Sequence, residues 1–137
     1  MHQHSFFLPV VPRAAARTRC ACHGKFPTVY NEPAYRTWLE TAKAELKKLD
    51  RPFSEAEPFT GDVWVALEVI VRKPKATKKV RPKGDVDNHL KGVFDAITQA
   101  GGFWADDDQV VEGVYQKRWA ADDEPEGYKL VVRFRDV

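Results

Sequence analysis

Carboxylates are concentrated in two segments of the chain that lie close together in sequence. Asp85 and Asp87 precede an apolar repeat of helical spacing, and an acidic triplet, 106–108, follows about one helix length later. Carboxylates forced together repel one another and have raised pKa values unless a cation neutralises them. Their oxygens favour Mg²⁺ or Mn²⁺, which leave coordination positions for water and phosphate. The pattern therefore predicts a site for metal-assisted phosphodiester hydrolysis.

A basic side chain accompanies the first acidic pair. Lys91 lies one helical turn after Asp87 on nearly the same helix face, where it would complement the charge of a phosphate. Asp95 follows Asp87 by eight residues, which is about 12 Å along a helix. That distance is too long for ligation of one metal ion. We expect Asp95 to be a local partner of Lys91 or of nearby backbone.

Common structural uses of the same residues compete with this interpretation. Asp87 or Asn88 would be suitable helix caps, and segment 106–108 would be suitable as a solvated turn. Spacing alone leaves the two interpretations about equally favoured. An EF-hand calcium loop is disfavoured, because its sixth and twelfth positions require glycine and glutamate, whereas counting from Asp85 gives Leu90 and Ala96.

Basic residues gather just before the first acidic pair. The segment 72–83, RKPKATKKVRPK, holds seven basic residues and no acidic one, although the net charge of the chain is only +2. Three arginines also fall in segment 13–30, which shows little periodicity. A basic surface beside an acidic cluster predicts a polyanion partner with salt-sensitive affinity. The residues expected to contact nucleic acid are Arg13, Arg17, Arg19, Lys75, Lys78, Lys79, Arg81 and Lys83.

Other reactive or aromatic residues are weaker candidates. Cys20, Cys22 and His23 could ligate zinc with His2 or His4, but the cluster lacks a second spaced pair, and free thiols in a reducing compartment are expected instead. A partly exposed helix position is expected for His89. Of the four tryptophans, Trp104 is the candidate for stacking on unpaired bases, and the other three are expected to pack in the core.

These residues require elements that position them. With 137 residues, 43% of them hydrophobic, the chain is expected to form one domain, 1–137. Periodicity predicts an α/β (α+β) fold, a mixed sheet of about four strands with two main helices. The predicted elements are an edge strand at 6–10, helices at 33–49 and 88–99, and strands at 61–72, 109–119 and 129–135. The absence of an apolar stretch long enough for a membrane span, or of a secretory signal, predicts a cytoplasmic protein without membrane contact.

The segment 85–111, DVDNHLKGVFDAITQAGGFWADDDQVV, resembles the RusA-type Holliday junction resolvases, small endodeoxyribonucleases common in phages and prophages. The shared pattern is an acid, any residue, Asp-Asn, two residues and Lys, followed by an apolar helix, Gly-Phe-Trp, paired acids and Gln-Val-Val. This resemblance implies that Asp85, Asp87 and Asp107 hold Mg²⁺, with Mn²⁺ as a substitute, and that Lys91 takes part in catalysis. Asp106 and Asp108 remain possible substitutes for Asp107.

The resemblance also implies a function. It predicts a structure-selective endodeoxyribonuclease that resolves Holliday junctions in recombination and repair and leaves 5′ phosphates. Because a four-way junction has approximate two-fold symmetry and needs paired cuts, a C2 homodimer bound to branched DNA is expected. The alternatives are a branched-DNA-binding protein without catalysis and a nuclease that also cuts flaps or forks.

Overall fold

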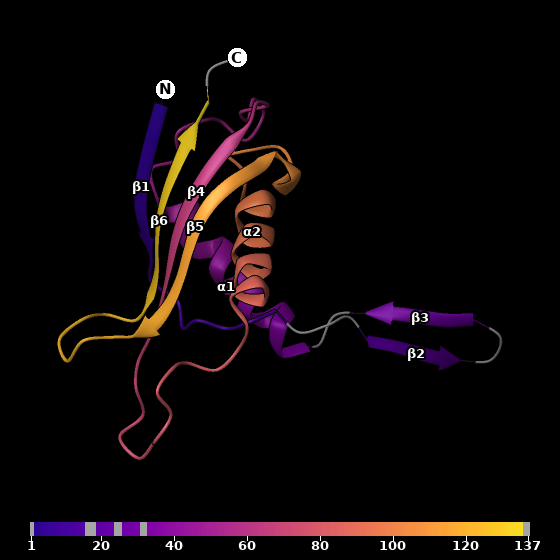
Figure 1. Ribbon diagram of the computed structural model, residues 1–137. Coiled ribbons are helices and arrows are strands. Elements are labelled where there is room, and N and C mark those ends of the chain that lie inside the picture. The colour runs from indigo at the N-terminus through magenta and orange to yellow at the C-terminus, as the bar shows by residue number, and fades with distance from the viewer. Residues whose placement is uncertain (1, 16–18, 24–25, 31–32, 136–137) are drawn as a thin grey trace.

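A four-stranded mixed sheet forms the centre of the computed structural model, which describes residues 2–15, 19–23, 26–30 and 33–135 (Figure 1). The order of the strands is β1-β6-β4-β5, and β4 pairs parallel to β5 but antiparallel to β6. The strands are β1 (His2–Leu8), β4 (Val63–Val71), β5 (Val110–Trp119) and β6 (Gly127–Phe134). The predicted mixed sheet is confirmed, as is the edge position of the first strand.

Two helices cover one face of the sheet, α1 (Pro33–Lys48) and α2 (Val86–Ala100). The alternating pattern of β4 explains why, since Val63, Val65, Leu67 and Val69 are buried in one core with the apolar stripes of both helices. The intervening residues, such as Trp64 and Ala66, lie half-buried on the opposite face. Within the described residues, no helix is long and apolar enough to cross a membrane.

An additional hairpin corrects the expectation that segment 13–30 lacks regular structure. The strands β2 (Arg19–His23) and β3 (Phe26–Tyr30) pair antiparallel in a separate two-stranded sheet. In Figure 1 this hairpin extends away from the four-stranded sheet. Five-residue strands are too short for a clear alternation, and Pro27 signals a break, although proline is tolerated in a strand that lies at an edge.

The connection from β4 to β5 carries the residues predicted to be functional. Because β4 and β5 are adjacent and parallel, the chain must cross back over the sheet between them, and α2 makes this crossover. The helix therefore begins beyond the carboxyl end of β4 and ends before the amino end of β5. It starts at Val86, two residues earlier than predicted, so that Asp87 lies in its first turn.

Candidate active site

Two exposed carboxylates occupy the beginning of α2. Asp85 is the N-cap residue, but its side chain makes no capping hydrogen bond, and Asp87 lies in the first turn. Both side chains are exposed. Helix capping by the side chain of Asp87 or Asn88 is therefore not what the structure shows, and negative charge at this end interacts favourably with the helix dipole. The Asp85 carboxylate is left available for a ligand.

The loop that leads into Asp85 is held from β5. Lys117 donates hydrogen bonds to the carbonyl oxygens of Pro82 and Gly84, at 2.9 and 2.6 Å. Gly84 has a φ of +93°, and a Cβ atom there would approach the Cβ of Ala14 to 2.9 Å. Lys117 and Gly84 thus fix the direction in which the chain enters α2. Sequence reasoning missed the role of Lys117, because an isolated lysine in a strand carries no signal of the loop it contacts.

Lys91 and Asp95 form an ion pair on the same helix. The Lys91 Nζ lies 3.3 Å from both carboxylate oxygens of Asp95, as expected for partners one turn apart. The hydroxyl of Tyr35, on α1, donates a hydrogen bond of 2.8 Å to the same carboxylate. Burial and this contact with Asp95 raise the pKa of Tyr35. The prediction that Asp95 is the local partner of Lys91 is confirmed.

Asp107 lies beside this pair, in the short 3₁₀ helix η1 (Asp107–Gln109). Partial burial raises the pKa of Asp107, as do a hydrogen bond with Asp106 and the negative charges of Asp95 and Asp106. The positive charge of Lys91 opposes this rise. Asp107 is thus a half-buried carboxyl in a negative environment, which a cation would relieve.

The other two acids of the triplet differ from Asp107. The Asp106 carboxylate caps η1 by accepting a hydrogen bond of 3.1 Å from the backbone N–H of Asp108, while the Gln109 side chain accepts one from the backbone N–H of Asp106. Gln109 also donates to the carbonyl oxygens of Phe59 and Gly61. Asp106 therefore has a structural task. The spacing of a capping box, an acid followed three residues later by Gln, was the available signal for it.

The acids are distributed along α2. Asp85 and Asp87 lie at its beginning, whereas Asp107 lies near Lys91 and Asp95, which flank its middle. A helix of 15 residues is about 22 Å long. In the part of the chain that the structure describes, no three Asp, Glu, His or Cys side chains are gathered so as to hold a metal ion. The donor chemistry nevertheless fits Mg²⁺, which often takes only one or two carboxylates and completes its shell with water and phosphate.

The basic residues lie at the end of the molecule where α2 begins. Lys75, Lys78, Lys79, Arg81 and Lys83 are all exposed on the loop between β4 and α2, which Figure 1 shows extending beyond the sheet. Arg13 is half-buried near this loop, and its backbone N–H donates to the hydroxyl of Tyr128. Arg19 belongs to β2, but its side chain is outside the described part, and Arg17 lies outside it entirely.

Side-chain expectations are wrong for His89 and for three of the four tryptophans: Trp104 is in the core, whereas Trp64 and Trp119, which were expected there, are only half-buried. His89 is buried, only 2% exposed, because its ring packs against the loop before α2, with Nε2 3.2 Å from the carbonyl oxygen of Lys83. Trp104 is also buried, packed edge-on against Phe94 and donating to Thr98, and so is unable to stack on DNA. The side chains of Cys20, Cys22 and His23 are outside the described residues.

One crossover of the mixed sheet carries exposed carboxylates, an adjacent lysine and a basic loop. These features define a class of protein suited to act on a phosphate-containing polyanion. Comparison with family models identifies the family to which the chain belongs. Residues 9–126 match the model described as Endodeoxyribonuclease RusA. This match covers most of the sequence, and the chain belongs to the RusA endodeoxyribonuclease family. No curated protein matches the chain significantly.

Proposed function

We propose that the protein is a Mg²⁺-dependent, structure-selective endodeoxyribonuclease that resolves Holliday junctions by paired phosphodiester hydrolysis. Family membership supports nuclease action on branched DNA. The observation that carries the proposal is the position of Lys91, one turn after Asp87 and close enough to Asp107 to shift its pKa. Lys91 is thus on nearly the same helix face as the acid at the helix start and within electrostatic reach of the acid of the triplet.

In this proposal Asp85, Asp87 and Asp107 are the metal ligands. Held by these carboxylates, Mg²⁺ would supply a water of lowered pKa and positive charge at the scissile phosphate. The two exposed carboxylates at the start of α2 bind and orient, while Lys91 donates hydrogen bonds to a phosphate oxygen as negative charge grows there. Mn²⁺ has the same preference for oxygen donors and is expected to substitute for Mg²⁺.

The test of activity uses synthetic four-way junctions, forks, flaps and linear duplexes, each with Mg²⁺, with Mn²⁺ or with EDTA. Paired, symmetric cuts in the four-way junction that require the metal are expected. Equal cutting of flaps or forks would assign a broader nuclease, and binding without cutting in any metal would assign a branched-DNA-binding protein. The Asp87→Asn variant is the matched negative control, because it keeps the shape of the side chain.

We also propose that two copies act together on one junction. The junction has approximate two-fold symmetry, and a chain with one set of acids makes one cut, so a C2 homodimer provides the second. Light scattering of the free protein and of its junction complex should show two chains, and a monomer in both would contradict this. Mixing Asp87→Asn with Asp107→Asn chains then tells which protomer supplies Asp107: restored cleavage assigns it to the partner, and inactivity to the same chain.

A further inference from the structure

A cavity of about 480 Å³ lies next to the candidate active site, between the N-terminal segment and the loop from β4 to α2. Four of the residues that line it are basic, namely Arg13, Arg72, Lys79 and Lys83, and we call these residues its basic rim. Trp119, at the end of β5, contributes an aromatic wall, and Val71 and Pro74 contribute apolar surface. The combination of an apolar interior with a cationic rim suits a ligand that has one flat apolar part and one anionic part.

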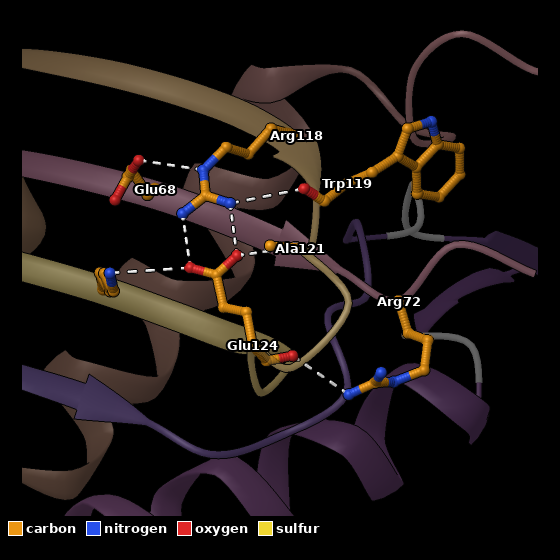
Figure 2. A network of polar contacts seen from close by, with 7 residues as sticks. Glu68, Arg72, Arg118, Trp119, Ala121 and Glu124 are labelled. Carbon is orange, nitrogen blue, oxygen red and sulfur yellow. Dashed lines mark hydrogen bonds and ion pairs between the residues drawn. The ribbon is translucent and has the colours of Figure 1, made fainter.

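The aromatic wall is held in place before any ligand binds. The indole Nε1 of Trp119 donates to the carbonyl oxygen of Lys79 at 3.3 Å. On the backbone side, Arg118 donates to the carbonyl oxygen of Trp119 and is itself fixed by a two-pronged ion pair with Glu124, at 2.6 and 2.7 Å. Figure 2 shows the Trp119 ring directed away from this ion-pair network. A wall that is already ordered reduces the entropy lost on binding.

The same network holds one cation of the rim. The backbone N–H of Arg72 donates to Glu126, and the guanidinium of Arg72 donates to the carbonyl oxygen of Glu124 (Figure 2). Contact with the guanidinium of Arg118 lowers the pKa of Glu124 to about 2. Glu124 is therefore ionised at the near-neutral pH at which DNA would bind. The root of the basic loop is therefore anchored to the turn between β5 and β6.

A buried histidine is one of the residues that line the cavity. His89 lines the cavity and is 2% exposed, and its Nε2 lies 3.2 Å from the carbonyl oxygen of Lys83. Its Nδ1 is buried without a hydrogen-bond partner among the residues that the structure describes. Since nearly all buried polar atoms in folded proteins are hydrogen-bonded, this Nδ1 is a polar atom that the described residues leave to be satisfied.

We propose that this cavity binds one unpaired nucleotide of branched DNA, with its base against Trp119 and its phosphates at the basic rim. The inference rests on the proposed action on DNA. Stacking on an aromatic ring accepts any base, and a nucleotide at a branch point costs less to unstack than one inside a duplex. Lys83 and Gly84 line the cavity and directly precede Asp85. A nucleotide bound there brings its neighbouring phosphate to the acids at the start of α2.

The test is a thermodynamic cycle between the protein and the DNA, measured in EDTA so that no cleavage occurs. Four-way junctions carry an abasic residue at each position next to the branch point in turn. At one position the wild type should lose roughly 10-fold in affinity, the scale of one base stacked on an aromatic ring. Trp119→Ala should lose the same factor on the intact junction and nothing further on that abasic junction. Trp119→Phe, which keeps an aromatic face, should retain most of the affinity.

The matched control is Trp64→Ala. Trp64 is also half-buried and lies under a cation, with the guanidinium carbon of Arg133 4.2 Å from its ring centroid, but it lies on the open face of the sheet. An equal loss for Trp64→Ala, or additive effects of Trp119→Ala and the abasic residue, would overturn the inference. The abasic series uses the wild-type protein and so does not depend on the folding of a variant. If the abasic residue lowers the affinity at none of the positions, the inference is overturned as well.

A further arm separates DNA from free nucleotide as the source of the ligand. Titration of the wild type with a deoxynucleoside monophosphate should show no saturation below millimolar concentrations, because a single nucleotide lacks the other phosphate contacts of the junction. Tight binding of the mononucleotide without coupling on the junction would overturn the assignment to DNA. One outcome is that the wild type cleaves junctions in Mg²⁺ while Trp119→Ala and the abasic residue lower the affinity independently of each other. In that case the cavity inference fails and the proposed nuclease function stands. Absence of cleavage in every metal contradicts the function itself.

Discussion

The ammonium group of Lys91 lies 3.3 Å from both carboxylate oxygens of Asp95, one helical turn further along α2. The lysine that we propose for contact with the scissile phosphate is therefore already paired with an acid. A phosphate that approaches Lys91 competes with Asp95 for its protons. Because Tyr35 also donates to Asp95, the acid keeps a hydrogen-bond donor when Lys91 turns to DNA. Asp95 thus orients Lys91 and sets how much of its charge is available.

This relationship predicts effects of different size for the two members of the pair. Asp95→Asn removes a negative charge next to Lys91 and Asp107 without changing shape, so junction affinity should rise a few-fold and cleavage should fall less than about 10-fold. Lys91→Ala should reduce the cleavage rate by roughly 100-fold, the order of one lost donor to a transition-state charge. Single-turnover cleavage at saturating enzyme measures both cleavage rates, and titration of the junction in EDTA measures the affinity. An Asp95→Asn protein as inactive as Lys91→Ala would instead make Asp95 part of the catalytic machinery.

The environment of Asp107 predicts that the ionised carboxylate proposed to bind the metal lowers the folding stability of the protein. Its pKa is raised above the ordinary value of 3.8, chiefly by burial, so the folded state binds its proton more tightly than the unfolded state does. Folding stability is therefore lost as the pH rises from about 3.8 through the folded-state pKa, and the loss persists at neutral pH. Asp107→Asn lacks this penalty and should be more stable than the wild type at pH 7 but not at pH 3.

Urea unfolding at several pH values, followed by tryptophan fluorescence, measures this difference. Asp108→Asn is the matched control, because its side chain is exposed. It should show no gain in stability at pH 7. A destabilised Asp107→Asn protein at neutral pH would mean that the Asp107 carboxylate is stabilising in the fold, which contradicts the proposed role as an acid kept in place for a cation.

The sequence predicted the elements with regular periodicity and missed the contacts between them. The β4 strand, with its alternating valines, and α2, with Val93 and Ile97 on one stripe, were predictable because one buried face imposes a period. The short strands β2 and β3 carry too few residues for such a period. His89 shows the other limit: whether a polar residue in a helix is buried depends on what packs there, in this case the loop at Gly84, which Ala14, far away in sequence, also approaches.

The candidate site was predictable to a similar extent. The residue types and the spacing of Asp87, Lys91 and Asp95 gave their common helix face and the ion pair correctly. Spacing had no means of showing that Asp107 returns to Asp95 and Lys91, because that position depends on how η1 packs against α2. Lys117 and Trp119 were missed for the same reason, since both act on the loop between β4 and α2 from a different strand.

The basic loop predicts a specific salt dependence. The exposed side chains of Lys78, Lys79 and Arg81 should neutralise phosphates and release counterions, each changing the slope of log affinity against log salt by about −0.9. Replacing all three by alanine should therefore flatten the slope by up to about 3 for a junction. Fluorescence anisotropy between low and moderate salt measures it. Replacing Lys47 and Lys48, exposed on α1, is the control and should leave the slope unchanged.

The acidic triplet provides the sharpest test of the proposed ligands, because its three members have different surroundings. Asp107→Asn should reduce cleavage by several orders of magnitude while junction binding persists, since it removes a ligand charge that faces phosphate. Asp106→Asn keeps an oxygen that can cap η1, so its activity and stability should stay near those of the wild type. Asp106→Ala loses the cap and should cost about 1 kcal/mol of folding stability without a comparable loss of cleavage. Asp108→Asn should change neither. Cleavage and urea unfolding of all four variants separate the roles, and equal, mild losses of cleavage across the triplet would assign this turn to structure alone.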